Sequence, residues 1–186
     1  MFIQTEATPN PATLKFLPGQ TVLEIGTADF PTSDSAGTSP LATAIFAVDG
    51  VTGVFLGHDF VTVTKEEPRD WNHLKPAILG AIMEHFQSGR AVLDDGDRPE
   101  EHTATDGPDS EIIVQIKELL DTRVRPAVAQ DGGDITFHGF DRGVVYLTMK
   151  GACAGCPSST MTLKMGIENL LRHYIPEVTE VRPVAA

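Results

Sequence analysis

Two cysteines carry the clearest chemical signal in this 186-residue sequence, and they are the only two it contains. Cys153 and Cys156 lie in the run Gly-Ala-Cys-Ala-Gly-Cys-Pro, with two residues between them. This spacing is typical of metal sites and redox dithiols, whereas a structural disulfide framework uses more cysteines, spread further apart. The pair therefore indicates a reducing cytoplasm and a thiol site with a chemical role.

The residues around the pair favour the reactive form of the thiol. Pro157 follows Cys156 and is favoured at the first position of a helix, so we expect Cys156 at the helix N-cap. Unpaired N–H groups and the positive end of the helix dipole favour thiolate, the form that binds metal or attacks a disulfide. The glycines of the run leave room for a large inorganic group beside the backbone.

Four interpretations of the pair follow. Reduced cysteines can pack as small hydrophobic residues. A closed zinc site needs four protein ligands, and the six histidines are scattered rather than spaced as in a zinc finger. A dithiol oxidoreductase also places its cysteines before a helix, but only 30 residues follow Cys156 and the pattern aromatic-Cys-Gly-Pro-Cys is absent. An iron–sulfur cluster needs four thiolates, which two copies of this loop related by a two-fold axis would supply.

Charge divides the chain into parts. Residues 1–93 carry 10 acids and 5 bases, and residues 112–186 carry 8 of each. Residues 94–111 carry 8 acids against one base and no large apolar side chain, so they cannot bury enough surface to offset the entropy of ordering. We expect two small α/β (α+β) domains, residues 1–93 and 111–186, each a short sheet packed with helices and joined by a flexible acidic linker over 94–110.

Local patterns predict the elements that position the thiols. In the first domain we expect strands at 13–17, 21–25, 53–56 and 60–64, a helix from Pro40 to about Val48, and a second helix that Asp70 caps and that ends near Gly89. In the second domain we expect a helix over 112–124 that Pro126 kinks or ends, a turn at Asp131-Gly-Gly-Asp134, strands at 135–140 and 144–149, the thiol loop, a helix to Tyr174 and an edge strand at 177–182.

Composition excludes several classes of function. A formal charge of −12 opposes sequence-independent binding of nucleic acid. No apolar run reaches the roughly 20 residues that span a bilayer, so no membrane partner is expected. The first residues lack the features of a signal peptide. No nucleophile–base set, phosphate loop or paired-carboxylate site stands out, so we do not expect a turnover catalyst.

Other candidate residues have plain structural interpretations. We expect His73 and His85 at the solvated surface of their helix and His138 on a strand face that points either to solvent or toward the thiols. Met161 and Met165 follow the thiols at helical spacing and are expected in the core. The run Thr8-Pro-Asn-Pro11 is interpreted as a rigid loop that fixes two strands, with partner recognition as the alternative.

The run from Asp131-Gly-Gly-Asp134 to Gly151-Ala-Cys-Ala-Gly-Cys-Pro-Ser-Ser159 resembles the C-terminal domain of NifU, the Nfu-type iron–sulfur scaffold and carrier domain. The opening Met1-Phe-Ile-Gln-Thr-Glu-Ala-Thr-Pro-Asn-Pro-Ala-Thr-Leu-Lys-Phe-Leu-Pro-Gly19 is similar to the N-terminal domain of Nfu proteins. The two matches cover nearly all of the chain outside the linker, in the order typical of that family.

The resemblance implies a carrier or scaffold that assembles or transfers a 4Fe–4S cluster, with a 2Fe–2S form as a further possibility. Cys153 and Cys156 match the family's ligand positions. The resemblance further implies a homodimer that the cluster bridges. The implied partners are an upstream cluster-assembly scaffold and apo iron–sulfur proteins as recipients. Because mitochondrial members would carry a presequence, we expect a bacterial, cytoplasmic protein.

Overall fold

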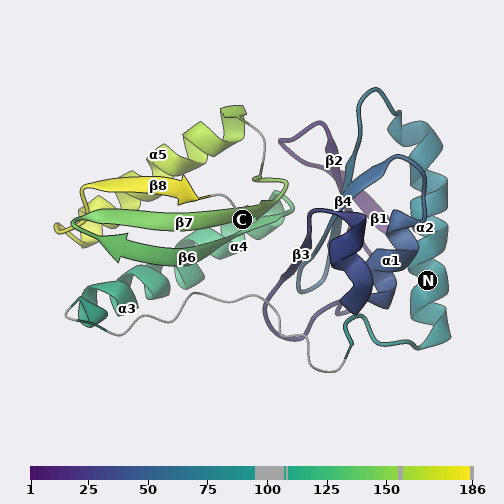
Figure 1. Ribbon diagram of the computed structural model, residues 1–186, viewed down its shortest axis with the longest axis horizontal. Helices are drawn as coiled ribbons and strands as arrows, with labels where there is room; N and C mark the ends of the chain where they lie inside the picture. The colour runs from purple at the N-terminus through teal and green to yellow at the C-terminus, as the bar shows by residue number, and fades with distance from the viewer. Residues whose placement is uncertain (95–106, 108, 155–156, 185–186) are drawn as a thin grey trace. The chain divides into compact units, whose positions relative to one another are not determined.

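The computed structural model describes residues 1–94, 107, 109–154 and 157–184 (Figure 1). The chain divides into two compact units between residues 100 and 101. Each unit contains a short sheet and helices, which confirms the predicted α+β class with two small domains. Most of the predicted acidic linker, residues 94–110, lies outside the described residues, so its flexibility stays a prediction.

A five-stranded antiparallel sheet forms the first unit, with the order β1-β2-β5-β4-β3. Its strands are β1 (Gln4–Ala7), β2 (Thr13–Leu17), β3 (Ala28–Phe30), β4 (Val51–Leu56) and β5 (Val61–Lys65). Strand β2, predicted at 13–17, is confirmed, and β4 begins two residues earlier than predicted.

Two capped helices pack on this sheet. At the N-terminus of α1 (Pro40–Phe46), the Ser39 hydroxyl accepts a hydrogen bond from the Ala42 amide. At the N-terminus of α2 (Trp71–Ser88), the Asp70 carboxylate accepts one from the Asn72 amide. Gly89 ends α2 in the left-handed conformation, as predicted. Helix α1 ends two residues before the predicted Val48, and a 3₁₀ helix (η1, Ser33–Thr38) precedes it.

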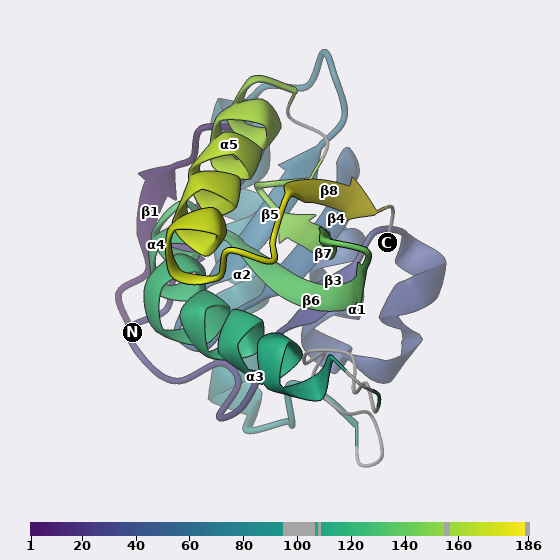
Figure 2. The same ribbon diagram turned by 90° about the vertical axis from the view of Figure 1, so that its left-hand side faces the viewer.

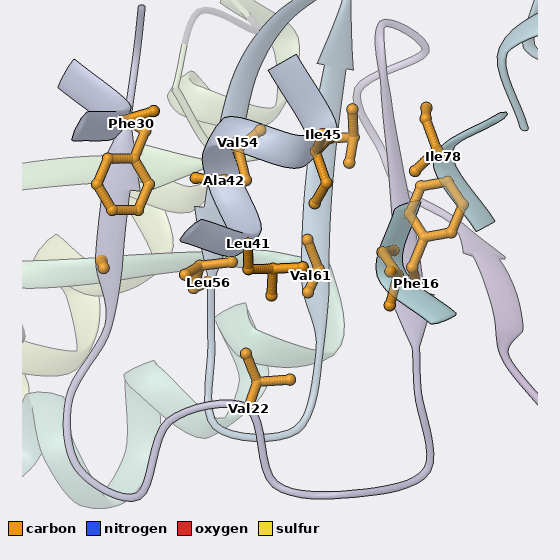
Figure 3. Close-up of a cluster of buried hydrophobic side chains, with 14 of the residues drawn as sticks. Phe16, Val22, Phe30, Leu41, Ala42, Ile45, Val54, Leu56, Val61 and Ile78 are labelled. Carbon is orange, nitrogen blue, oxygen red and sulfur yellow. The ribbon is translucent and has the colours of Figure 1, made fainter. Parts of the chain in front are cut away.

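The core of the first unit lies between the sheet and these helices. Figure 3 shows Leu41 and Ile45 of α1 and Ile78 of α2 near side chains of the sheet. The sheet contributes alternate residues, because successive side chains of a strand point to opposite faces. They include Phe16, Phe30, Val54, Leu56, Val61 and Val63.

The predicted strand at 21–25 is wrong. Val22 and Leu23 are buried in the core, but their amides both donate to the carbonyl oxygen of His58 instead of to a neighbouring strand. The apolar pattern therefore correctly indicates burial, in a loop rather than in a strand. The short strands β1 and β3 were not predicted.

The second unit has a three-stranded sheet with the order β6-β7-β8. Strands β6 (Gly133–Asp141) and β7 (Val144–Gly151) form the predicted antiparallel hairpin. Strand β8 (Glu180–Val184) lies parallel to β7 at the edge of the sheet, three residues later than the predicted start of the edge strand.

The helices of the second unit are α3 (Ser110–Leu119), α4 (Arg125–Gln130) and α5 (Pro157–Tyr174) (Figures 1 and 2). A π-helical turn, η2 (Leu120–Val124), joins α3 to α4, and the Arg125 amide bonds to the Leu120 carbonyl five residues back. Pro126 lies in the first turn of α4, directly after this π-helical turn. The helix that was predicted to kink or end at Pro126 is instead interrupted just before this residue, by the π-helical turn.

A single core joins these elements. It combines Ile116 and Leu120, which precede the hairpin, with Ile167 and Leu171 of α5. Alternate residues of β6 and β7 complete it, which places the helices on one face of the sheet. The strand residues are Ile135, Phe137, Val145, Leu147 and Met149.

Candidate functional site

The thiol loop begins at residue 152, where β6 and β7 stop pairing, and the structure describes it as far as residue 154. Gly133 and Gly151 are the last partners of the ladder at this end. The φ angle of Gly151 is +64°, a left-handed conformation that a residue without Cβ adopts without penalty. The chain turns there from β7 toward α5, so the Asp-Gly-Gly-Asp run and the thiol run lie beside each other.

Hydrogen bonds hold the described part of the loop at both of its ends. The Ala152 amide donates to the Gly132 carbonyl at 3.2 Å, which ties the loop to the turn before β6. The Thr160 hydroxyl donates to the Cys153 carbonyl at 3.1 Å, which ties it to the first turn of α5. The described part of the loop is therefore tied to the turn before β6 and to the first turn of α5.

Cys153 packs into the interior of the second unit. It is 5% exposed and belongs to the core cluster of that unit. A Cβ atom placed on Gly133 would lie 2.7 Å from the Cys153 Sγ atom, so only glycine fits opposite the sulfur. Cys156 lies outside the described residues, and the structure therefore places one of the two predicted ligands. Helix α5 begins at Pro157, as predicted.

A buried ion pair fixes the strand that carries Gly133. Arg125 donates from Nε and Nη2 to the two carboxylate oxygens of Asp134, both at 2.8 Å, and from Nη1 to Asp121 at 3.0 Å. The hydrogen bonds with Asp134 raise the pKa of Arg125 more than burial lowers it, so the guanidinium stays charged. The paired fork holds the start of β6, directly after Gly133, against the helices.

The site is thus a turn and a thiol loop held together beside the start of a helix, and the chain that contains it matches two known domain families. Residues 3–89 match the family described as "Scaffold protein Nfu/NifU N terminal", and residues 116–182 match the one described as "NifU-like domain". "NifU-like protein 5, mitochondrial" of Arabidopsis thaliana is 56% identical over 184 residues, which cover 97% of this chain and 67% of that protein. The chain belongs to the Nfu/NifU family.

Further relatives extend this result. "NFU1 iron-sulfur cluster scaffold homolog, mitochondrial" of Homo sapiens is 52% identical over 185 residues, which cover 99% of this Nfu/NifU chain and 72% of that protein. The chain spans about two thirds of the length of the curated relatives it matches. A solution structure of a NifU-like protein from Saccharomyces cerevisiae covers 51% of this chain and 86% of its own, with 28% identity and a TM-score of 0.47.

The comparisons correct the prediction of location. The expected bacterial, cytoplasmic setting is wrong, because these relatives of the Nfu/NifU chain are mitochondrial proteins of eukaryotes. The prediction depended on the thiol pair, interpreted as a sign of a reducing cytoplasm, and on the residues at the start of the chain. Since the relatives are longer than this chain, its first residues do not report the compartment.

Two other groups of residues also differ from expectation. His85 is 5% exposed rather than solvated, because it continues the buried face of α2 that Leu74, Ile78 and Ile82 begin. Its Nε2 atom has no hydrogen-bond partner among the described residues. His73 is exposed, as predicted. His138, for which solvent and the thiol side were both left open, is also exposed.

Met161 and Met165 are exposed rather than in the core, by 67% and 61%. They lie on the side of α5 opposite to Ile167 and Leu171, which face the sheet. The exposure of the two methionines could have been predicted from the helical periodicity of α5. They fall outside the apolar face that Leu163, Ile167, Leu170 and Leu171 define.

The structure gives Thr8-Pro-Asn-Pro11 the character of a rigid loop. The Thr8 hydroxyl donates to the Asn10 carbonyl at 2.8 Å, and the Asn10 side chain accepts from the Ala12 amide at 3.0 Å. The Trp71 indole donates to the Pro11 carbonyl at 3.3 Å, which ties the loop to α2. These bonds fix the connection between β1 and β2.

Sequence reasoning missed two residues that shape the thiol loop. Gly133 was interpreted only as part of a turn, and Arg125 was not singled out. The signal for the first was the pair of glycines in the Asp-Gly-Gly-Asp run, since only one of them is needed for a tight turn. The pairing of Arg125 with Asp134 depends on the packing of α4 against β6 and has no local signature.

Among the described residues, no group of three or more His, Cys, Asp or Glu side chains gathers in a way that could hold a metal ion. No helix in the described part of the chain is long and apolar enough to cross a membrane.

Proposed function

We propose that this chain is an iron–sulfur cluster carrier that takes part in cluster assembly and passes a 4Fe–4S cluster to apo-proteins. Cys153 and Cys156 of each of two copies would supply the four thiolates that such a cluster requires. The observation that carries the proposal is the anchored thiol loop in a chain of the Nfu/NifU family. The name of the human relative, an iron–sulfur cluster scaffold homolog, supports it.

The number of cysteines supports a shared cluster. The chain contains two cysteines in all, so one copy leaves half of the ligand positions of a 4Fe–4S cluster without a thiolate. A second copy related by a two-fold axis provides the missing pair with the same geometry. A 2Fe–2S cluster held in the same way would also need four ligands, so the cluster type is decided by iron and sulfide content.

The contact between Gly133 and Cys153 assigns each residue a role. The absence of a side chain at Gly133 gives the Cys153 sulfur its place, and the Thr160 hydroxyl holds the carbonyl of the same residue. Because Cys153 is almost fully buried, loading requires its sulfur to turn outward from the core.

Transfer is an exchange of ligands without net oxidation or reduction. The sulfur of a recipient thiol forms a bond to an iron atom and gives up its proton as the bond from that iron to Cys153 or Cys156 breaks. The proton of the incoming thiol passes to the departing thiolate, and four such exchanges release the cluster. This series of ligand exchanges needs no turnover catalyst, which agrees with the role of a carrier rather than an enzyme.

The names of these relatives describe mitochondrial proteins, which supports a mitochondrial setting for this function. The recipients would be apo iron–sulfur proteins, and the donor an upstream scaffold of cluster assembly.

Anaerobic reconstitution tests the proposal. The full chain is loaded with ferrous iron and sulfide, separated by size-exclusion chromatography, and assayed for iron and acid-labile sulfide. We expect a coloured dimer with about four irons and four sulfides per pair of chains, absent in Cys153→Ser and in Cys156→Ser. A colourless monomer whose two cysteines cycle between dithiol and disulfide would overturn the proposal in favour of a redox enzyme. Metal without labile sulfide would instead indicate a plain iron or zinc site.

A further inference from the structure

Two exposed methionines mark the helix that follows the thiol loop. Met161 and Met165 are one turn apart, so their side chains lie on the same side of α5. Each is more than half exposed. Helix α5 lies at the surface of the second unit (Figure 2). We call the surface made by Met161, Thr162 and Met165 the methionine face.

The apolar character of this side of α5 is limited to the half next to the thiol loop. Further along the same side, Asn169 is exposed and Arg172 pairs with Glu168 at 3.8 Å. Met161 is the fifth residue of α5, so it lies about 6 Å along the axis from the helix start. The methionine face therefore lies in the first half of α5, the half that follows the thiol loop in the chain.

Charge on α5 also distinguishes this region. Between Pro157 and Ile167 the helix has no acidic residue and one base, Lys164. Residues 112–186 carry 8 acids and 8 bases, so net charge does not hold two copies of this part of the chain apart. The methionine face is a part of its surface that two copies can bring together without opposing carboxylates.

Methionine suits a contact that forms and separates. Its unbranched side chain is polarizable and adapts to different neighbouring surfaces. Exposed apolar side chains that gather beside a site indicate a surface for association, whereas single ones scattered over a protein need no explanation. Val114 of α3, which is 62% exposed, is an example of the second kind.

We propose that the methionine face is the contact between two copies of this chain in the cluster-bearing dimer. The inference rests on the proposed function, because the count of two thiols per chain makes a second copy necessary for a 4Fe–4S cluster. A two-fold axis through the cluster brings the same surface of both copies together. The two α5 helices, which begin at the thiol loops, then approach each other at their first turns.

The double variant M161Q/M165Q tests the contact. Glutamine has nearly the same length and helix propensity as methionine, so α5 is expected to keep its stability. The full chain is loaded with iron and sulfide, and the dissociation of the loaded dimer is followed by anaerobic sedimentation over a dilution series. We expect the dimer of the variant to dissociate at about tenfold higher protein concentration than wild type, because truncation or replacement of buried contact residues weakens an interface by this order.

The control is Val114→Thr, which replaces an exposed apolar residue of α3 and is expected to leave the dimer unchanged. An M161Q/M165Q dimer as tight as wild type would overturn the inference. Equal dimer affinity with slower transfer to a four-cysteine apo-protein would also overturn it and assign the face to the recipient. Failure of the proposed function is a separate result, since wild type itself would then form no loaded dimer.

Discussion

Gly133 lies so close to Cys153 that a single added carbon would occupy the space of the sulfur. The position of a Cβ at residue 133 is 2.7 Å from the Cys153 Sγ atom and 2.8 Å from the backbone oxygen of Lys150. The second of these atoms belongs to β7 and cannot rotate away. The start of β6 therefore forms one wall of the thiol site, and the wall depends on the absence of a side chain.

Gly133→Ala is expected to displace the thiol loop. Overpacking against a sulfur and a backbone oxygen destabilises a protein by about 1–3 kcal/mol, and here the strain falls on the loop that carries the ligand. We expect the variant to bind less iron and sulfide after reconstitution and to lose free energy of unfolding in the second unit. Chemical denaturation followed by the fluorescence of Tyr146 and Tyr174, the only tyrosines and both in this unit, measures the loss.

Gly139→Ala on the same strand is the matched control. A Cβ at residue 139 meets no atom within 4 Å, so this variant should keep both its cluster content and its stability. If Gly133→Ala behaves like Gly139→Ala, the close contact with Cys153 is not a constraint on the site.

Arg125→Met is expected to destabilise the second unit strongly. The substitution keeps an apolar stem of similar length but leaves the buried Asp134 carboxylate without its bidentate partner. Removal of one member of a buried ion pair costs on the order of 3 kcal/mol. Urea unfolding followed by tyrosine fluorescence should show this loss, together with reduced retention of a loaded cluster.

Two further variants separate the causes of this effect. Arg69→Met removes the more exposed pairs of Arg69 with Asp49 and Glu66 in the first unit, and such pairs contribute about 0–1 kcal/mol. The double variant R125M/D134L removes both buried charges and should recover most of the stability lost in Arg125→Met. A double variant as unstable as the single one would show that the charge left at Asp134 is not what destabilises the fold.

Gly80→Ala is expected to stabilise the first unit by about 0.5–1 kcal/mol. Gly80 lies inside α2, a Cβ there meets no atom within 4 Å, and glycine is a poorer helix former than alanine by this amount. Gly50→Ala should do the opposite, because φ is +102° and the Cβ would lie 3.1 Å from the Arg69 side chain. Trp71, the only tryptophan, reports unfolding of this unit. Equal stability of the two variants would contradict this reasoning.

Elements with local signals could be predicted from the sequence. Ser39 and Asp70 predict the N-terminal ends of α1 and α2, because their side chains accept hydrogen bonds from helix amides. Gly89 predicts the C-terminal end of α2. The hairpin of β6 and β7 and the start of α5 at Pro157 are also local. Their predictions are confirmed because the deciding interactions lie within a few residues.

Elements that depend on distant partners could not be predicted. Strand β1 has mixed polar residues and becomes a strand because it pairs with β2, where Glu6 lies opposite Lys15. The apolar pair Val22 and Leu23 resembles a strand, but its backbone bonds go to a single carbonyl 35 or more residues away. The same limit applies to the site. The two motifs are visible in the sequence, whereas the contact of Gly133 with Cys153 depends on the register of a ladder.

The stability of the first unit is expected to fall in mild acid because of His85. Burial lowers the pKa of His85, and the positive charge of Arg90 lowers it further. In the unfolded chain the pKa of histidine is about 6.5, so below that pH the unfolded state binds a proton more readily than the folded state. The free energy of unfolding therefore decreases as the pH falls from about 6.5 through the lowered pKa of the folded state. Above about pH 6.5 the contribution of His85 to this free energy does not change with pH.

Urea unfolding followed by Trp71 fluorescence at several values between about pH 7.5 and pH 5.5 measures this dependence. His85→Leu removes the titrating group and should flatten the decrease, since no proton can then distinguish the two states at this position. His73→Gln on the same helix is the matched control and should retain the wild-type decrease, because His73 is exposed. A His85→Leu protein that loses stability in acid as steeply as wild type would assign the effect to other groups, and the burial of His85 would then have no part in it.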